Sequence, residues 1–205
     1  NSALGYAWRA NRRVWHDLRP VEVSYNKLYF SSDAFNAFLD QNTAVRRSFE
    51  QQFIIGAGYT YTLNTQRRGG RGWLLLSLGI DEGGNLTSVL SRAGGQRPED
   101  GYTVFSERYA QFVRFRPEIR YYKPLDGRGE LLATRMLVNV GLPYGNSDVL
   151  PYVKRFFSGG PNSLRAFRAR GVGPGSYVPA EGGALQVDQV GDIQFEVNAE
   201  YRFTI

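Results

Sequence analysis

Three glutamates are the residues of this 205-residue chain whose types and spacing could support catalysis. Glu196 and Glu200 lie on one face of an expected strand, and Glu118 lies on the corresponding face of another. Neighbouring carboxylates can act as general acid and general base, as they do in glycoside hydrolysis. A hydrolase is therefore one interpretation of the sequence.

Other catalytic groups are scarce. The chain has no cysteine and one histidine, His16, so a thiolate or histidine-cluster metal site, a cysteine nucleophile and a disulfide framework are excluded. His16 is next to Trp15 at the base of an expected strand, where a ligand role is not favoured. The sequence contains neither a GxSxG elbow nor a phosphate-binding Gly/Lys loop. It predicts no enzyme activity, no cofactor and no metal.

Arg165 is the other candidate functional residue. It lies between residues 155 and 177, which read RFFSGGPNSLRAFRARGVGPGSY. An arginine that folds inward loses hydration and is retained where carboxylates meet its planar guanidinium. Glu196 and Glu200 are the candidate partners, and a solvated loop arginine is the alternative.

The elements that must position these residues are strands. Polar and apolar side chains alternate through the last fifteen residues. The polar set is Asp192, Gln194, Glu196, Asn198, Glu200 and Arg202, and the apolar set is Ile193, Phe195, Val197, Ala199, Tyr201, Phe203 and Ile205. A strand with one polar and one apolar face, about twice as long as is usual in soluble proteins, is typical of a barrel wall between lipid and a water-filled lumen.

The same alternation predicts seven strands, at residues 3–9, 14–29, 49–64, 73–80, 107–122, 130–143 and 191–205. Short turns alternate with long loops at 31–48, 81–106 and 144–188, as in outer-membrane barrels. A short amphipathic helix is expected in the first long loop, where Phe35, Phe38 and Leu39 follow the cap candidates Ser32 and Asp33. Pro117 predicts a bulge. The strand glycines Gly56, Gly58 and Gly79 predict a sharp bend or a close approach by another segment, such as an inward-folded loop.

The expected fold class is all-β, an antiparallel transmembrane β-barrel segment. No stretch reaches the roughly 20 apolar residues of a spanning helix, so a bilayer would be crossed by strands. Lipid should meet Phe53, Leu76, Phe115, Val138 and Phe195, and the lumen should hold Thr60, Arg116, Arg135 and Glu196. The net charge of +6 raises nucleic acid as a partner, but the basic residues are scattered, so none is predicted. A soluble β-sandwich binding module is the alternative.

The glycine-rich segment resembles the conserved loop of the Omp85 superfamily, the outer-membrane assembly and translocation barrels of the BamA and TamA type. That loop carries an aliphatic residue, Arg, Gly and an aromatic, and the matching residues here are Leu164, Arg165, Ala166 and Phe167, with Gly159, Gly160 and Asn162 before them. Ala166 replaces the usual glycine, which argues against a positive φ there. Phe156, Phe157 and the form GGPNSLRAF are most similar to the TamA-like branch in Bacteroidetes.

The resemblance implies that residues 1–205 are part of one bacterial outer-membrane barrel domain, about strands six to twelve of sixteen, so the chain is expected to be a fragment. It implies that the long loop at 144–188 folds inward and that Arg165 pairs with Glu200, with Phe167 against the lumen wall. The implied function is non-enzymatic insertion or export of other outer-membrane proteins. The implied partners are outer-membrane lipid, client proteins and periplasmic or lipoprotein accessory subunits. A two-partner-type secretion pore shares the arginine loop and stays an alternative.

Overall fold

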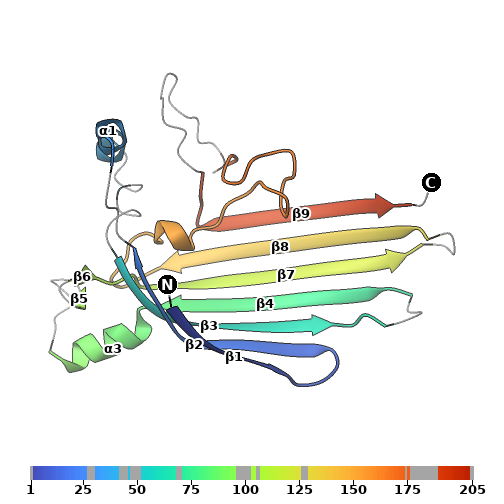
Figure 1. The fold of residues 1–205 in the computed structure, drawn as a ribbon, viewed down its shortest axis with the longest axis horizontal. Helices are drawn as coiled ribbons and strands as arrows, with labels where there is room; N and C mark the ends of the chain where they lie inside the picture. The colour runs from blue at the N-terminus through green and yellow to red at the C-terminus, as the bar shows by residue number, and fades with distance from the viewer. Residues whose placement is uncertain are drawn as a thin grey trace.

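The computed structural model describes residues 2–26, 31–41, 46, 52–67, 71–95, 103–104, 107–125, 129–173, 175 and 189–203. Its main feature is a curved, seven-stranded antiparallel sheet with the order β1-β2-β3-β4-β7-β8-β9 (Figure 1). The strands are β1 (Ser2–Arg9), β2 (Val14–Asn26), β3 (Gln52–Asn64), β4 (Trp73–Gly83), β7 (Phe112–Pro124), β8 (Leu131–Pro143) and β9 (Ile193–Arg202). The sheet is open, with β1 and β9 at its edges. The predicted antiparallel all-β segment with seven strands is confirmed.

Short turns lie at one end of the sheet and long connections at the other (Figure 1). The long connections hold α1 (Asp33–Gln41), α3 (Asn85–Ala93), the 3-10 turn η2 (Tyr152–Lys154) and a small ladder of β5 (Thr103–Val104) with β6 (Glu107–Arg108). Helix α1 was predicted, and the backbone N–H of Phe35 donates to Ser32 Oγ at 3.2 Å, as expected of a capping serine. Helix α3 was not predicted, because residues 81–106 were expected to form a loop. In the described part of the chain, no helix is long and apolar enough to cross a membrane.

Strand pairing places the alternating side chains on two separate faces. Leu76 lies opposite Ile119, Phe115 opposite Val140, and Val138 opposite Phe195, so the predicted lipid-facing residues of these strands share one face. We call this the outer face. Many of its large side chains are exposed in this chain, among them Ile119 at 38% and Ile193 at 69%, whereas Leu76, Val138 and Val140 are half-buried. The predicted alternation is therefore confirmed in these strands.

The inner face carries polar side chains and a small buried cluster where the long connections begin. Ile54, Ala110, Phe112 and Leu150 form this cluster. A Cβ on Gly141 would lie 2.3 Å from Leu150 Cδ1, so glycine at this strand position makes room for the loop. The core thus lies where the connection after β8 turns onto the inner face.

The predicted bulge at Pro117 is wrong. Leu78 pairs with Pro117 and Glu118 with Leu137 in unshifted registers. The register shifts instead in β2, between Arg19 and Glu22, around Pro20. Because a bulge adds one residue to one strand, Arg19 and Glu22 both reach the inner face.

Candidate functional site

The connection between β8 and β9, residues 144–192, carries the arginine motif and is closed at its base. Phe156 and Gly191 exchange two backbone hydrogen bonds, of 2.9 and 2.8 Å. Arg155 Nε lies 3.1 Å from Asp192 Oδ1 at the same place. These contacts hold the two sides of the loop together next to the start of β9.

The arginine motif itself forms a tight turn. The N–H of Phe167 donates to the carbonyl of Leu164 at 3.0 Å, which puts Arg165 and Ala166 at the centre of the turn. Gly159 has φ 96°, and a Cβ there would lie 2.1 Å from the Arg168 carbonyl oxygen. Gly159 therefore needs to be glycine. Ala166 has no positive φ, so alanine fits where related loops have glycine.

The tip of the loop is bound to the inner face by charged hydrogen bonds. Ser163 Oγ donates to Glu196 Oε2 at 2.6 Å. Arg135 Nη1 donates to Glu196 Oε1 at 3.1 Å and to the carbonyl of Asn162 at 2.7 Å. The Glu196 side chain is only 5% exposed. Of the carboxylates that contact the loop in the described part of the chain, Glu196 is thus the most deeply buried.

This contact continues across the sheet. Glu118 Oε1 on β7 accepts from Arg135 Nε and from Arg120 Nε, both at 2.6 Å. Carboxylates and guanidinium groups therefore alternate from Arg120 through Glu118 and Arg135 to Glu196. We call these four residues the lower cluster, because they lie nearer the short turns. They include two of the glutamates that sequence analysis considered for acid–base chemistry.

Arg165 does contact Glu200, but at the margin of the site. Arg165 Nη2 lies 3.4 Å from Glu200 Oε1, and the two side chains are 73% and 40% exposed. Glu200 is held more closely by Arg202 Nη2, at 2.7 Å. Phe167 is 53% exposed, so the seven strands described here do not enclose it. The chain brings Arg165 and Glu200 together without the expected loss of hydration.

An opening of about 530 Å³ is lined by the loop tip together with residues of β7, β8 and β9. Its lining includes Arg120, Arg135, Arg165 and Arg202 with Asn198 and Glu200. The space is polar and bordered by more cations than anions. Among the described residues, no group of three or more His, Asp or Glu side chains is placed to hold a metal.

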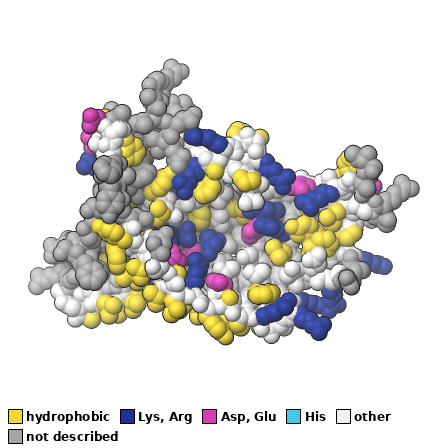
Figure 2. All heavy atoms as spheres, in the orientation of Figure 1, with side chains coloured by type: hydrophobic (Ala, Val, Ile, Leu, Met, Phe, Trp, Pro, Cys, Tyr) yellow, Lys and Arg dark blue, Asp and Glu magenta, His cyan; other side chains and the backbone are white. Residues whose placement is uncertain are grey.

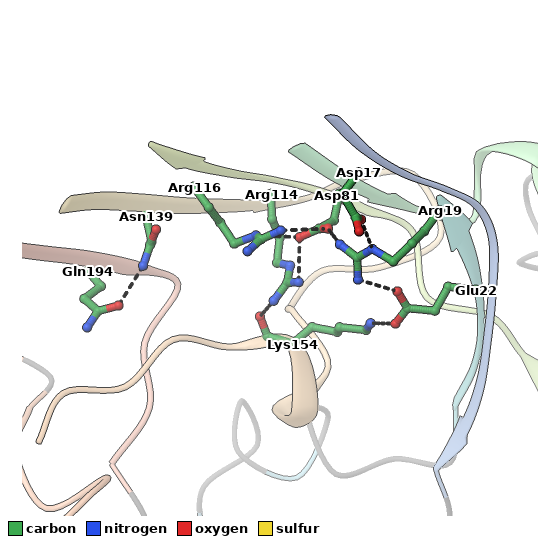
Figure 3. A network of polar contacts seen from close by, with 9 residues as sticks. All are labelled: Asp17, Arg19, Glu22, Asp81, Arg114, Arg116, Asn139, Lys154 and Gln194. Atoms are coloured by element: carbon green, nitrogen blue, oxygen red, sulfur yellow. Dashed lines mark hydrogen bonds and ion pairs between the residues drawn. The ribbon is translucent and has the colours of Figure 1, made fainter. Parts of the chain in front are cut away.

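A second ion cluster lies nearer the long connections, centred on Asp81 of β4 (Figure 3). Asp81 accepts from Arg114 Nη2 at 2.7 Å, from Arg116 Nε at 2.7 Å and from Arg19 Nη2 at 3.0 Å. The Asp81 side chain is 7% exposed and that of Arg114 15%. One buried carboxylate thus joins side chains from β2, β4 and β7.

The same cluster ties down the base of the loop. Lys154 Nζ donates to Glu22 Oε1 in a short ion pair, and Arg114 Nη1 donates to the carbonyl of Lys154 at 2.9 Å. Glu22 also accepts from Arg19 Nη1 at 3.3 Å. We call Arg19, Glu22, Asp81, Arg114, Arg116 and Lys154 the upper cluster. It fixes η2 against the wall.

Strand glycines give this cluster its space. A Cβ on Gly58 would lie 2.8 Å from both Arg19 Nη2 and Asp81 Oδ1, and one on Gly79 would lie 3.0 Å from Arg116 Cζ. The close approach predicted at Gly58 and Gly79 therefore comes from the charged side chains of the cluster, Arg19 and Asp81 at Gly58 and Arg116 at Gly79, and not from an inward loop as we expected.

Sequence analysis missed Asp81, Lys154 and Ser163. It ended the fourth strand at Ile80 and assigned Asp81 to a loop. The alternation through Ser77 and Gly79 would have put Asp81 on the inner face opposite Arg114. No pattern in the sequence pairs Lys154 or Ser163 with a strand, because both lie in the irregular connection.

The open antiparallel sheet, with an apolar outer face and a charged inner face that binds a folded loop, defines a segment of a membrane β-barrel wall. The Omp85 superfamily domain matches the chain over residues 1–205, and the chain belongs to this superfamily. Its members are outer-membrane proteins, bacterial or organellar, that act in assembly or translocation of other proteins. Neither the curated proteins nor the solved structures compared with the chain include a match.

Proposed function

We propose that this chain is part of a bacterial outer-membrane barrel that inserts or exports other outer-membrane proteins and catalyses no reaction. The observation that carries the proposal is the family match over residues 1–205, on a sheet whose inner face binds the loop with the arginine motif. Glu118, Glu196 and Glu200 each contact arginine side chains, which suits a structural role for these carboxylates. The partners would be outer-membrane lipid, client proteins and periplasmic or lipoprotein accessory subunits.

The loop would serve this function as a brace for the wall. Lys154 and Arg114 hold its base, and Ser163 and Glu196 hold its tip. A barrel that opens to pass a client needs the rest of its wall to keep its curvature. The loop supplies contacts between strands that backbone pairing alone does not.

The finer assignment is also part of the proposal. The seven strands would be about strands six to twelve of a sixteen-stranded barrel of the TamA-like branch. The support is the form GGPNSLRAF and the position of the loop before the last of the seven strands. The complete reading frame would test it: a different strand count or different upstream domains would remove this assignment.

Depletion of the protein in the cells that carry it would test the function. Several unrelated β-barrel proteins should fall together in the outer membrane, with unfolded precursors accumulating in the periplasm. Loss of one secreted protein at normal levels of other barrels would favour the two-partner secretion pore instead. Unchanged barrels and unchanged secretion would overturn both.

A further inference from the structure

Helix α3 buries its polar side and exposes its apolar side, the reverse of an amphipathic helix on the surface of a soluble protein. Its buried residues are Thr87, Ser88 and Ser91, which are small and polar. Its large apolar residues point away from the protein, with Leu86 53% exposed, Val89 65% and Leu90 62%. A helix that borders water normally buries its apolar side, so this orientation calls for an apolar neighbour.

Polar contacts fix this orientation. Ser88 Oγ and Tyr109 Oη are 2.8 Å apart, and Tyr144 Oη donates to Asn85 Oδ1 at 2.7 Å. At the start of the helix, Gly84 N–H donates to the carbonyl of Ile55 on β3 at 2.7 Å. A Cβ on Gly84 would lie 2.4 Å from the carbonyl oxygen of Ala110. The helix is therefore held by its polar side against the rim of the sheet.

The exposed side of α3 continues the outer face of the wall. The helix begins directly after β4, whose outer residues Leu78 and Ile80 are 43% and 40% exposed. Helix α3 lies beside β3 at the end of the sheet that carries the long connections (Figure 1), and Figure 2 shows hydrophobic side chains there and onward along the lower edge of the sheet. The three large apolar residues of α3 are more exposed than Leu78 and Ile80 of β4.

We propose that α3 is an interfacial membrane anchor. It lies in the leaflet that borders the long connections, with Leu86, Val89 and Leu90 among the acyl chains. Their i, i+3, i+4 spacing puts them on one side, at about 100° per residue, with Asn85 and Arg92 on the flank at headgroup level. The lipid is recognised by its apolar chains, and the proposal rests on the barrel wall being embedded in the membrane.

Site-specific quenching by lipid would test this. The 205 residues contain no cysteine, so once any cysteine elsewhere in the complete protein is replaced by serine, a single introduced cysteine carries the only thiol-linked fluorophore. The complete protein would be reconstituted without any other protein in phosphatidylcholine vesicles with and without brominated acyl chains. The labelled variants are Val89→Cys on α3, Ile80→Cys on the outer face of β4, and Arg92→Cys on the flank of the same helix. Heat-modifiable migration on a gel would confirm that each variant is folded.

The expected result is strong quenching at Ile80, clear but shallower quenching at Val89, and the least at Arg92. Quenching at Ile80 with Val89 no more quenched than Arg92 would overturn the anchor, and would show that water or another part of the protein covers this side. An unquenched label at Ile80 would overturn the embedded wall itself, and the anchor with it. The two failures are therefore distinguishable.

Discussion

Asp81→Asn should destabilise the folded barrel more than any other single carboxylate replacement on the inner face. The change keeps the shape of the side chain but removes the charge that three arginines share, at distances of 2.7 to 3.0 Å. Removing one partner of a buried ion pair costs about 3 to 5 kcal/mol. Arg19 and Arg116 are about one third exposed, so water replaces part of what they lose. Arg114, which is 15% exposed, is the cation left unpaired, and we expect a loss of about 3 kcal/mol.

Asp17→Asn is the matched control. Asp17 lies on the same face and contacts Arg19 at 3.5 Å, but its side chain is 53% exposed. Its replacement should cost no more than about 0.5 kcal/mol. Urea unfolding of the complete protein in detergent, followed by tryptophan fluorescence, would give both values. Equal effects of the two substitutions would refute the argument that Asp81 organises the upper cluster.

Three further predictions concern the loop and its supports. Ser163→Ala should cost about 1 to 2 kcal/mol by removing a hydrogen bond to a buried charge and speed chymotrypsin cleavage in residues 144–192, while Ser163→Thr keeps the hydroxyl and should resemble wild type. Gly58→Ala should destabilise by about 1 to 3 kcal/mol, because the new Cβ would lie 2.8 Å from Arg19 Nη2 and Asp81 Oδ1; an unchanged midpoint in urea would contradict this. Arg165→Ala should loosen the loop less than Ser163→Ala in the same protease assay, because its contact with Glu200 is long and exposed; faster cleavage than in Ser163→Ala would show that other parts of the protein enclose Arg165.

The wall was predictable from the sequence because one physical rule governs it. A strand between two different media must alternate, and a register slip of one residue would exchange its faces. Phe115 and Val140, or Val138 and Phe195, could therefore be assigned to one face without coordinates. Pro117 was misread because its missing N–H was taken to require a bulge, whereas both neighbouring registers run through it unshifted.

The loop contacts were only partly predictable. Glycine spacing and the arginine motif identified the segment, and strand alternation placed Glu196 and Glu200 on the face that it meets. Which carboxylate binds which loop residue depends on the path of an irregular chain. Sequence analysis therefore expected Arg165 to bind the loop to the inner face, whereas in the structure Ser163 and Asn162 make those contacts. Helix α3 was hidden for another reason: only three large apolar residues mark it, and its buried side is polar like a loop.

The upper cluster shows why the inner face needs both charges and glycines. Arg19, Gly58, Asp81 and Arg114 lie opposite one another in a single row across β2, β3, β4 and β7. Backbone hydrogen bonds join only adjacent strands, but Arg19 reaches Asp81 over β3, because Gly58 has no side chain to block it. An ion pair that spans a strand opposes any change in the angle between the strands on either side. Lys154 extends this restraint to the loop through Glu22. The row therefore couples the curvature of the wall to the position of the loop, so that loosening either one weakens the other.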